Sequence, residues 1–221
     1  MHANELISDE IPPLRPSDPA IKAIGWMDEF KVAHLPIVDK NRFVGMVAEI
    51  DLLDLESAEQ PLSESDLPLN STCINGDRHV FEVIKMMADH NLSVVAVVEN
   101  EMGNYLGSVS MVHLMEVISD MSVVSDPGGI IILEINQHDY MLSQIARCVE
   151  DNDAKILGTF ITSHADSTKM VVTLKINRSE IDPIIQSLER FDYNIIGSYG
   201  ELHRDQGLQD RWDSLMNYLN I

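Results

Sequence analysis

The stretches His34–Asp39 (HLPIVD) and Gly45–Leu52 (GMVAEIDL) decide the fold of this chain. Each contains an apolar run of strand length, and the polar residues between the two runs predict a turn at Asp39–Arg42. The second stretch ends on a carboxylate, Asp51, directly before a predicted helix starting at Leu52. We therefore expect two neighbouring buried strands joined by a turn, with a carboxylate at the end of the second strand.

The same pattern recurs 60 residues later, from position 34 to position 94, in Val94–Glu99 (VVAVVE) and then Gly107–His113 (GSVSMVH). The upstream segments also correspond, since residues 17–27 align with residues 77–87. Self-similarity at a fixed period indicates a tandem array of one supersecondary unit. We expect each repeat to be a β-α-β-β-α unit.

Local signals refine the first repeat. The segment 6–14 contains two consecutive prolines and predicts an extended segment at a sheet edge. Asp18 is a predicted helix N-cap, with Pro19 at the first helical position. The Ser-, Glu- and Pro-rich residues 56–68 predict the link between the repeats.

The run Asp126–Gly129 (DPGG) marks the clearest domain boundary. Beyond it we expect four strands, at residues 130–135, 156–162, 170–176 and 194–199. A hairpin turn is predicted at 164–168, and two amphipathic helices lie between the strands, the first of them capped by Asp139. The order βαββαβ is the split βαβ pattern of a ferredoxin-like sandwich.

Past residue 200, apolar residues at helical spacing predict a C-terminal amphipathic helix that packs on its own domain or on a second subunit. These residues are Leu208, Trp212, Leu215, Met216 and Leu219. We therefore predict an α+β chain with two repeats, a ferredoxin-like domain and a C-terminal helix. Their ranges are 1–62, 63–126, 127–200 and 201–221.

Composition and charge limit the classes of protein and of binding partner that fit this chain. With 45% hydrophobic and 23% charged residues, the 221-residue chain resembles ordinary folded proteins. No apolar run is long enough for a membrane helix, and no signal peptide is visible. Cys73 and Cys148 lie in apolar segments and are predicted to be reduced core residues. We therefore expect a cytoplasmic protein. The net charge of −21 includes 7 basic and 22 acidic residues within 1–126, and this sign predicts neither nucleic acid nor membrane as a partner.

The repeated pattern of a helix with proline at its start, then Leu35–Asp39, Gly45–Val47 and Asp51, resembles a tandem pair of CBS domains over about residues 4–120. The unit at about 129–200 resembles an ACT domain in its topology. Together they resemble the acetoin-utilisation B-type proteins. The resemblance implies a pseudo-twofold module with two clefts for adenosine-containing ligands, and a homodimer whose regulated partner is unknown.

The cleft signature of the CBS family is a Ser or Thr three residues before an Asp. In the family the carboxylate accepts the ribose hydroxyls and the hydroxyl meets the first phosphate. The first repeat has Ala48 and Asp51, whereas the second has Ser110 and His113, so neither signature is complete. Asp51 has a plainer alternative role, as a surface carboxylate or the cap of the following helix. If one cleft binds a ligand, we expect it to be the one ending at Asp51.

The resemblance assigns twelve residues to the clefts. They are Pro12, Leu14, His34, Leu35, Pro36, Asp51, Thr72, Ile74, Val94, Val95, Ser110 and His113. Because residues 1–126 hold so few cations, AMP, free adenosine or the cationic S-adenosylmethionine suits the clefts better than a triphosphate without a metal.

Ligand-binding ACT domains usually carry a glycine after the first strand. Here the corresponding loop is 136–139 (NQHD), which has no glycine, and His138 is expected to face solvent. This domain is therefore expected mainly to pair with its twin in a second subunit.

Catalytic signatures are absent from the sequence: there is no HExxH, CxxC, G-x-S-x-G or Gly-rich phosphate loop. The eight histidines are scattered, so we expect no dedicated metal site, no required cofactor and no enzyme. The first hypothesis is a ligand-responsive regulator. The alternatives are a ligand-free dimerisation scaffold with degenerate clefts, and an unrecognised hydrolase.

Overall fold

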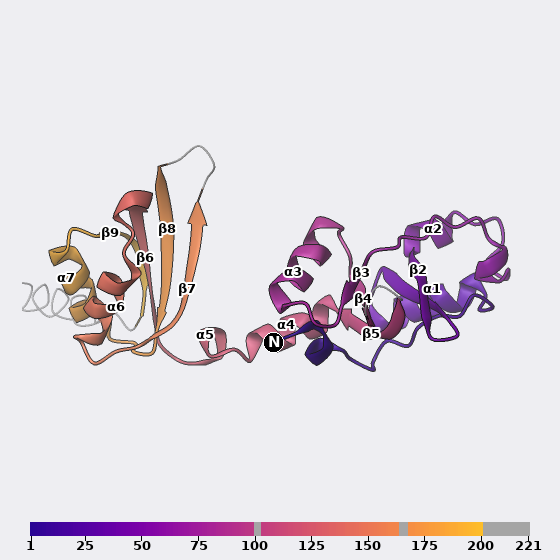
Figure 1. The fold of residues 1–221 in the computed structure, drawn as a ribbon, viewed down its shortest axis with the longest axis horizontal. Coiled ribbons are helices and arrows are strands. Elements are labelled where there is room, and N and C mark those ends of the chain that lie inside the picture. The colour runs from indigo at the N-terminus through magenta and orange to yellow at the C-terminus, as the bar shows by residue number, and fades with distance from the viewer. Residues whose placement is uncertain (100–102, 164–167, 201–221) are drawn as a thin grey trace, which may run out of the picture. The chain divides into compact units, whose positions relative to one another are not determined.

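The computed structural model describes residues 1–99, 103–163 and 168–200, and the chain divides into two compact units after Ser119 (Figure 1). The first unit contains one five-stranded sheet in the order β1-β2-β5-β4-β3. Its elements are η1 Ala3–Leu6, α1 Ala20–Phe30, β1 His34–Asp39, β2 Arg42–Ala48, α2 Glu49–Leu53, η2 Leu62–Glu64, β3 Cys73–Asn75, α3 Val80–Asp89, β4 Val94–Glu99, β5 Asn104–Ser110 and α4 Met111–Ser119.

The strand register confirms the sequence repeat. Leu35 pairs with Val47 in the first hairpin, and the equivalent Val95 pairs with Val109 in the second. Both hairpins shift register at the same place, after Ile37 and after Val97, which are again 60 residues apart. The predicted turn after β1 is two residues long, and both of them, Lys40 and Asn41, have positive φ as a tight hairpin turn requires.

The two repeats share a core through β4. Five of its six residues are buried, so both faces of this strand are covered. Val94 and Ala96 belong to the cluster that contains the α1 and β1 side chains, whereas Val95 and Val97 belong to the cluster that contains the α3 side chains. A strand buried on both faces reads as a continuous apolar run, which is why this stretch is almost entirely valine.

The first repeat departs from three local predictions. Its first segment, 6–14, lies along the edge strand β1 as predicted but forms only isolated bridges, Leu14 to Ile37 and Ser8 to Ser108, because the prolines lack N–H donors. Helix α1 begins at Ala20, after Pro19, and Asp18 is not its cap, because its carboxylate accepts from the Arg15 N–H at 2.8 Å and pairs with a lysine instead. Asp51 lies inside α2 and so does not cap a helix starting at the next residue.

The second unit has the predicted βαββαβ order, in an antiparallel sheet β7-β8-β6-β9. Its elements are α5 Ser122–Ser125, β6 Gly129–Asn136, η3 Gln137–Asp139, α6 Leu142–Glu150, β7 Ile156–Ser163, β8 Lys169–Ile176, α7 Asp182–Arg190 and β9 Asn194–Tyr199. Alternate residues of β6, including Ile131 and Leu133, pack with the α6 and α7 side chains in one core. This is the arrangement expected of a split βαβ sheet covered on one face.

Other predictions in the second unit have mixed outcomes. The expected cap Asp139 is wrong: it lies in η3 and accepts from the side chain of Asn136 at 2.9 Å, and α6 begins three residues later. His138 is exposed, as expected. The predicted C-terminal helix at 201–221 and most of the hairpin turn at 164–168 lie outside the described residues.

Cys73 and Cys148 are both unpaired, and Cys148 is buried. Across the described residues, no helix combines the length and the apolar character that crossing a lipid bilayer requires.

Candidate functional site

The two repeats meet where β1 and β4 begin. The backbone N–H of Ala33 donates to the hydroxyl of Ser93 at 2.9 Å, and the same hydroxyl lies 3.1 Å from Nδ1 of His34. The N–H of Ser93 also donates to Nδ1, at 3.3 Å. Because Nδ1 accepts this bond, the neutral ring carries its proton on Nε2. Ser93 of one repeat therefore fixes the orientation of His34 in the other.

Asp51 approaches this junction from α2. Burial lowers the pKa of the half-buried His34, and the negative charge of Asp51 opposes part of that shift. The imidazole is therefore neutral near pH 7, with the carboxylate close enough to influence it. Two of the predicted cleft residues, His34 and Asp51, are thus brought together with Ser93, a residue that sequence reasoning did not select.

The equivalent place in the second repeat has the same backbone and different side chains. The N–H of Glu49 donates to the carbonyl of Ala33 at 2.9 Å, and the N–H of Met111 donates to the carbonyl of Ser93 at the same distance. The hydroxyl of the buried Ser110 accepts from the N–H of His113 at 3.1 Å and so binds the first turn of α4.

The His113 ring lies 3.4 Å from the carboxylate of Glu116. Here the apolar Val94 stands at the position of His34, so the polar group that faces Asp51 in the first repeat has no counterpart.

The remaining predicted residues lie elsewhere. Four are buried in the core; they are Leu35, Pro36, Val94 and Val95. Thr72 donates its hydroxyl to the side chain of Asn70 at 2.6 Å. Ile74 lines a cavity of about 430 Å³ beside α3. Pro12 and Leu14 line a cavity of about 1050 Å³ near the far end of β1.

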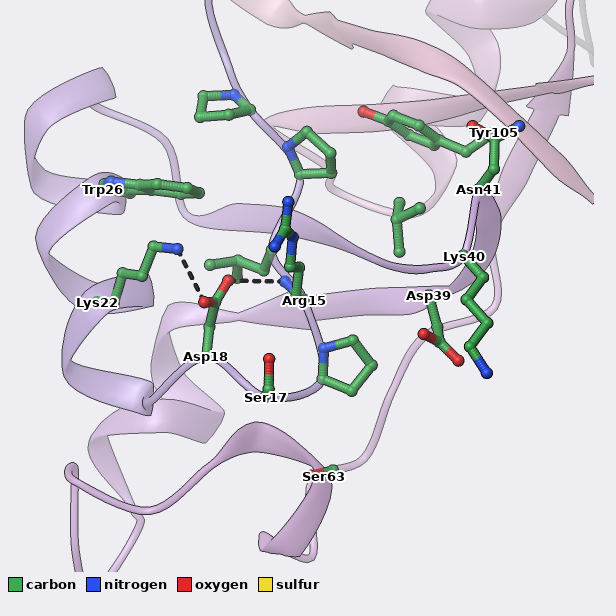
Figure 2. Close-up of a pocket in the computed structure, with 15 residues that line it drawn as sticks. Arg15, Ser17, Asp18, Lys22, Trp26, Asp39, Lys40, Asn41, Ser63 and Tyr105 are labelled. Atoms are coloured by element: carbon green, nitrogen blue, oxygen red, sulfur yellow. Dashed lines mark hydrogen bonds and ion pairs between the residues drawn. The ribbon is translucent and has the colours of Figure 1, made fainter.

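That larger cavity is the feature that sequence reasoning missed. Its walls include Arg15, Lys22, Trp26 and Tyr105, drawn in Figure 2. No motif connects these residues, because Tyr105 comes from the second repeat and only the fold places it beside the first. Burial raises the pKa of Tyr105, and the nearby Ser108 opposes this shift. Neither hydroxyl has a hydrogen-bond partner among the residues that the structure describes.

The second unit has a smaller cavity, of about 460 Å³, where β6 passes into α6. His138 and Asp139 of the glycine-free loop line it, together with Tyr193, whose hydroxyl donates to the side chain of Gln144 at 3.0 Å. A side-chain hydrogen bond from Lys169 lowers the pKa of Glu134 at its rim. Within the ranges that the structure describes, no three His, Cys, Asp or Glu side chains gather as metal ligands would.

The family model of the CBS domain matches this chain twice, over residues 3–58 and 66–120, which together make up half of its 221 residues. A putative acetoin utilization protein from Vibrio cholerae is 20% identical, with 57% of this chain and 95% of that one aligned at a TM-score of 0.49. A CBS domain pair/ACT domain protein from Thermotoga maritima is 19% identical, with 53% of this chain and 96% of that one aligned at a TM-score of 0.47. The CBS domains of a transcriptional regulator from Streptococcus pneumoniae are 18% identical, with 52% of this chain and 98% of that one aligned at a TM-score of 0.46.

Proposed function

Because this chain belongs to the CBS domain family, we propose that it is a non-catalytic, cytoplasmic regulatory protein that senses an adenosine-containing ligand. The ligand is AMP, adenosine or S-adenosylmethionine. The observation that carries this proposal is the junction of the repeats, where Asp51 lies near a half-buried histidine that the other repeat holds in place. The two unpaired cysteines support a reducing compartment.

The chemistry of the junction suits a ribose. A carboxylate such as Asp51 accepts both hydroxyls of a ribose through charge-assisted hydrogen bonds. Nδ1 of His34 is occupied by Ser93, whereas its Nε2 has no hydrogen-bond partner among the described residues and is available to donate to a ligand. The neutral imidazole adds no positive charge to balance Asp51, so the junction favours ligands with little negative charge.

Ligand binding at this place would act on both repeats. His34 and Asp51 come from the first repeat, and Ser93, which holds His34, comes from the second. A ligand that contacts His34 therefore stabilises one arrangement of the two repeats over others, and this differential affinity is the basis of the proposed regulation.

We further propose that the second unit is an ACT-like domain that pairs with the same unit of a second copy. Its two edge strands, β7 and β9, expose large apolar side chains; they are Phe160, Ile161, Ile196 and Tyr199. Exposed apolar edge strands are templates for pairing with another chain. Light scattering of the purified protein tests this: we expect the mass of a dimer, and a monomer at micromolar concentration would contradict it.

Calorimetric titration and thermal melts test the sensing function. We expect AMP or S-adenosylmethionine to bind and to raise the melting temperature, because a ligand that binds only the native state stabilises it. The incomplete signatures favour one competing function, a dimerisation scaffold without a ligand. No shift with AMP, adenosine or S-adenosylmethionine at millimolar concentration would contradict ligand sensing and favour that scaffold. Tightest binding of ATP without a metal would contradict the argument from charge.

A further inference from the structure

Only some of the basic side chains in the two CBS repeats form salt bridges. Residues 1–126 contain 7 of them. Four form salt bridges, and they are Lys22, Lys31, Arg78 and Lys85. The other three, Arg15, Lys40 and Arg42, have no salt bridge within the part of the chain that the structure describes. In a protein with 36 acidic residues, unpaired cations are unexpected.

Two of the three cations without a salt bridge lie at one place. Arg15 and Lys40 line the cavity of about 1050 Å³, whereas Arg42, which begins β2, does not line it. In Figure 2 the guanidinium of Arg15 extends toward the middle of this cavity, with Trp26 on one side and Tyr105 on the other. The fold therefore assembles a cationic site on an otherwise acidic unit.

The acidic residues of the cavity do not cancel these charges. Asp18 already pairs with Lys22, whose Nζ lies 2.8 Å from its carboxylate, and it accepts the Arg15 N–H as well. Burial raises its pKa, but these hydrogen bonds, together with the positive charges of Lys22 and Arg15, outweigh burial and leave the pKa of Asp18 lowered. In total, three basic side chains, Arg15, Lys22 and Lys40, line the cavity against two carboxylates, Asp18 and Asp39. The cavity thus has a net positive charge that attracts an anion.

The remaining walls suit a flat, weakly polar group. Trp26 is half-buried, with the ammonium of Lys22 at 4.3 Å from the centre of its ring. Three prolines also line the cavity, and they are Pro12, Pro13 and Pro16. Binding sites of small molecules commonly combine such apolar walls with a few polar groups that fix the ligand's orientation.

We propose that this cavity binds a small phosphate monoester that carries a planar ring, with Arg15 as the main phosphate partner and Trp26 as the ring contact. A guanidinium binds phosphate through two parallel hydrogen bonds, which an ammonium cannot do. The site is separate from the junction beside Asp51. β1 runs from His34 at the junction to Asp39 at the cavity, which is about 17 Å at strand spacing.

Fluorescence titration tests the proposal, because the chain has 2 tryptophans and Trp212→Phe leaves Trp26 as the reporter. We use phenyl phosphate as the probe, with inorganic phosphate and phenol to separate the contributions of charge and ring. Phenyl phosphate should change the emission of Trp26 saturably and bind more tightly than either fragment. Arg15→Gln should weaken binding by about tenfold or more.

Two variants act as matched controls for the change at Arg15. Lys31→Gln removes the same charge from an exposed position that does not line the cavity, and Asp51→Asn alters the junction. Both should leave the affinity for phenyl phosphate within about twofold. No saturable response at millimolar phenyl phosphate would overturn the proposal. Equal weakening by Arg15→Gln and Lys31→Gln, or loss of binding in Asp51→Asn, would overturn it as well.

Discussion

The two CBS repeats have matching backbones and different chemistry. The strands pair in the same register, and the same backbone hydrogen bonds close each repeat at Ala33 and Ser93. The side chains at the junction differ, because Asp51 and His34 in the first repeat correspond to a histidine and a valine in the second. The apolar pattern that specifies the fold thus leaves the polar positions free to diverge. The polar side chains at the end of each repeat are therefore not set by the fold that the two repeats share.

The cores of the two repeats provide the largest expected effect. Leu35 and Val95 are equivalent and fully buried. Leu35→Ala should reduce the free energy of unfolding by about 2–5 kcal/mol, because it leaves a cavity. Val95→Ala removes fewer carbons and should cost about 2 kcal/mol. Urea denaturation followed by circular dichroism measures both.

The exposed Ile21→Ala is the control for these core variants, with an expected change within about 0.5 kcal/mol. A larger loss in Val95→Ala than in Leu35→Ala would contradict the assignment of the two cores.

The next largest effect is expected at Ser93, because its counterpart in the first repeat, Ala33, has no hydroxyl. Ser93→Ala should cost about 1–3 kcal/mol, since the partly buried N–H of Ala33 loses its acceptor and His34 loses a partner. The same denaturation experiment measures it. The exposed Ser71→Ala should be nearly neutral, and an equal cost in both variants would show that the Ser93 hydroxyl does not join the repeats.

A hydroxyl at position 48 would complete the cleft signature of the first repeat. Ala48→Thr gives the first repeat the hydroxyl that the second repeat has at Ser110. We expect it to tighten AMP binding by about tenfold, through a hydrogen bond to the phosphate. Ala48→Val has nearly the same shape without the hydroxyl and should not tighten binding in calorimetry. Equal effects of the two substitutions would attribute the gain to shape.

The pH dependence of stability is the smallest expected effect. Burial lowers the pKa of His34 from its ordinary 6.5, so the unfolded chain binds this proton more readily than the folded one. Stability from this group is complete above pH 6.5 and is lost as the pH falls toward the lower folded pKa.

Asp51→Asn removes the charge that raises the pKa of His34, so the pKa should fall further and the loss on acidification should be larger. NMR titration of His34 in both proteins measures the shift. An unchanged or higher pKa in Asp51→Asn would contradict the proximity of the two groups.

The sequence predicted the repeats and nearly all strands, because the apolar runs and their spacing are local properties of the chain. It failed at the expected caps. Asp18 and Asp139 have the right residue type, but Arg15 and Asn136 offer them other hydrogen-bond donors. The cavity around Arg15 could not be predicted, because one of its walls is Tyr105 of the other repeat.

The function of the junction is tested most directly by one calorimetric comparison. AMP is titrated into the unmodified protein, Asp51→Asn and His113→Gln under the same conditions. We predict that the unmodified protein binds AMP, that Asp51→Asn weakens binding by about tenfold or more, and that His113→Gln changes it by less than about twofold. Equal weakening by both variants, or no binding of AMP, adenosine or S-adenosylmethionine to the unmodified protein, would contradict ligand sensing by the first repeat.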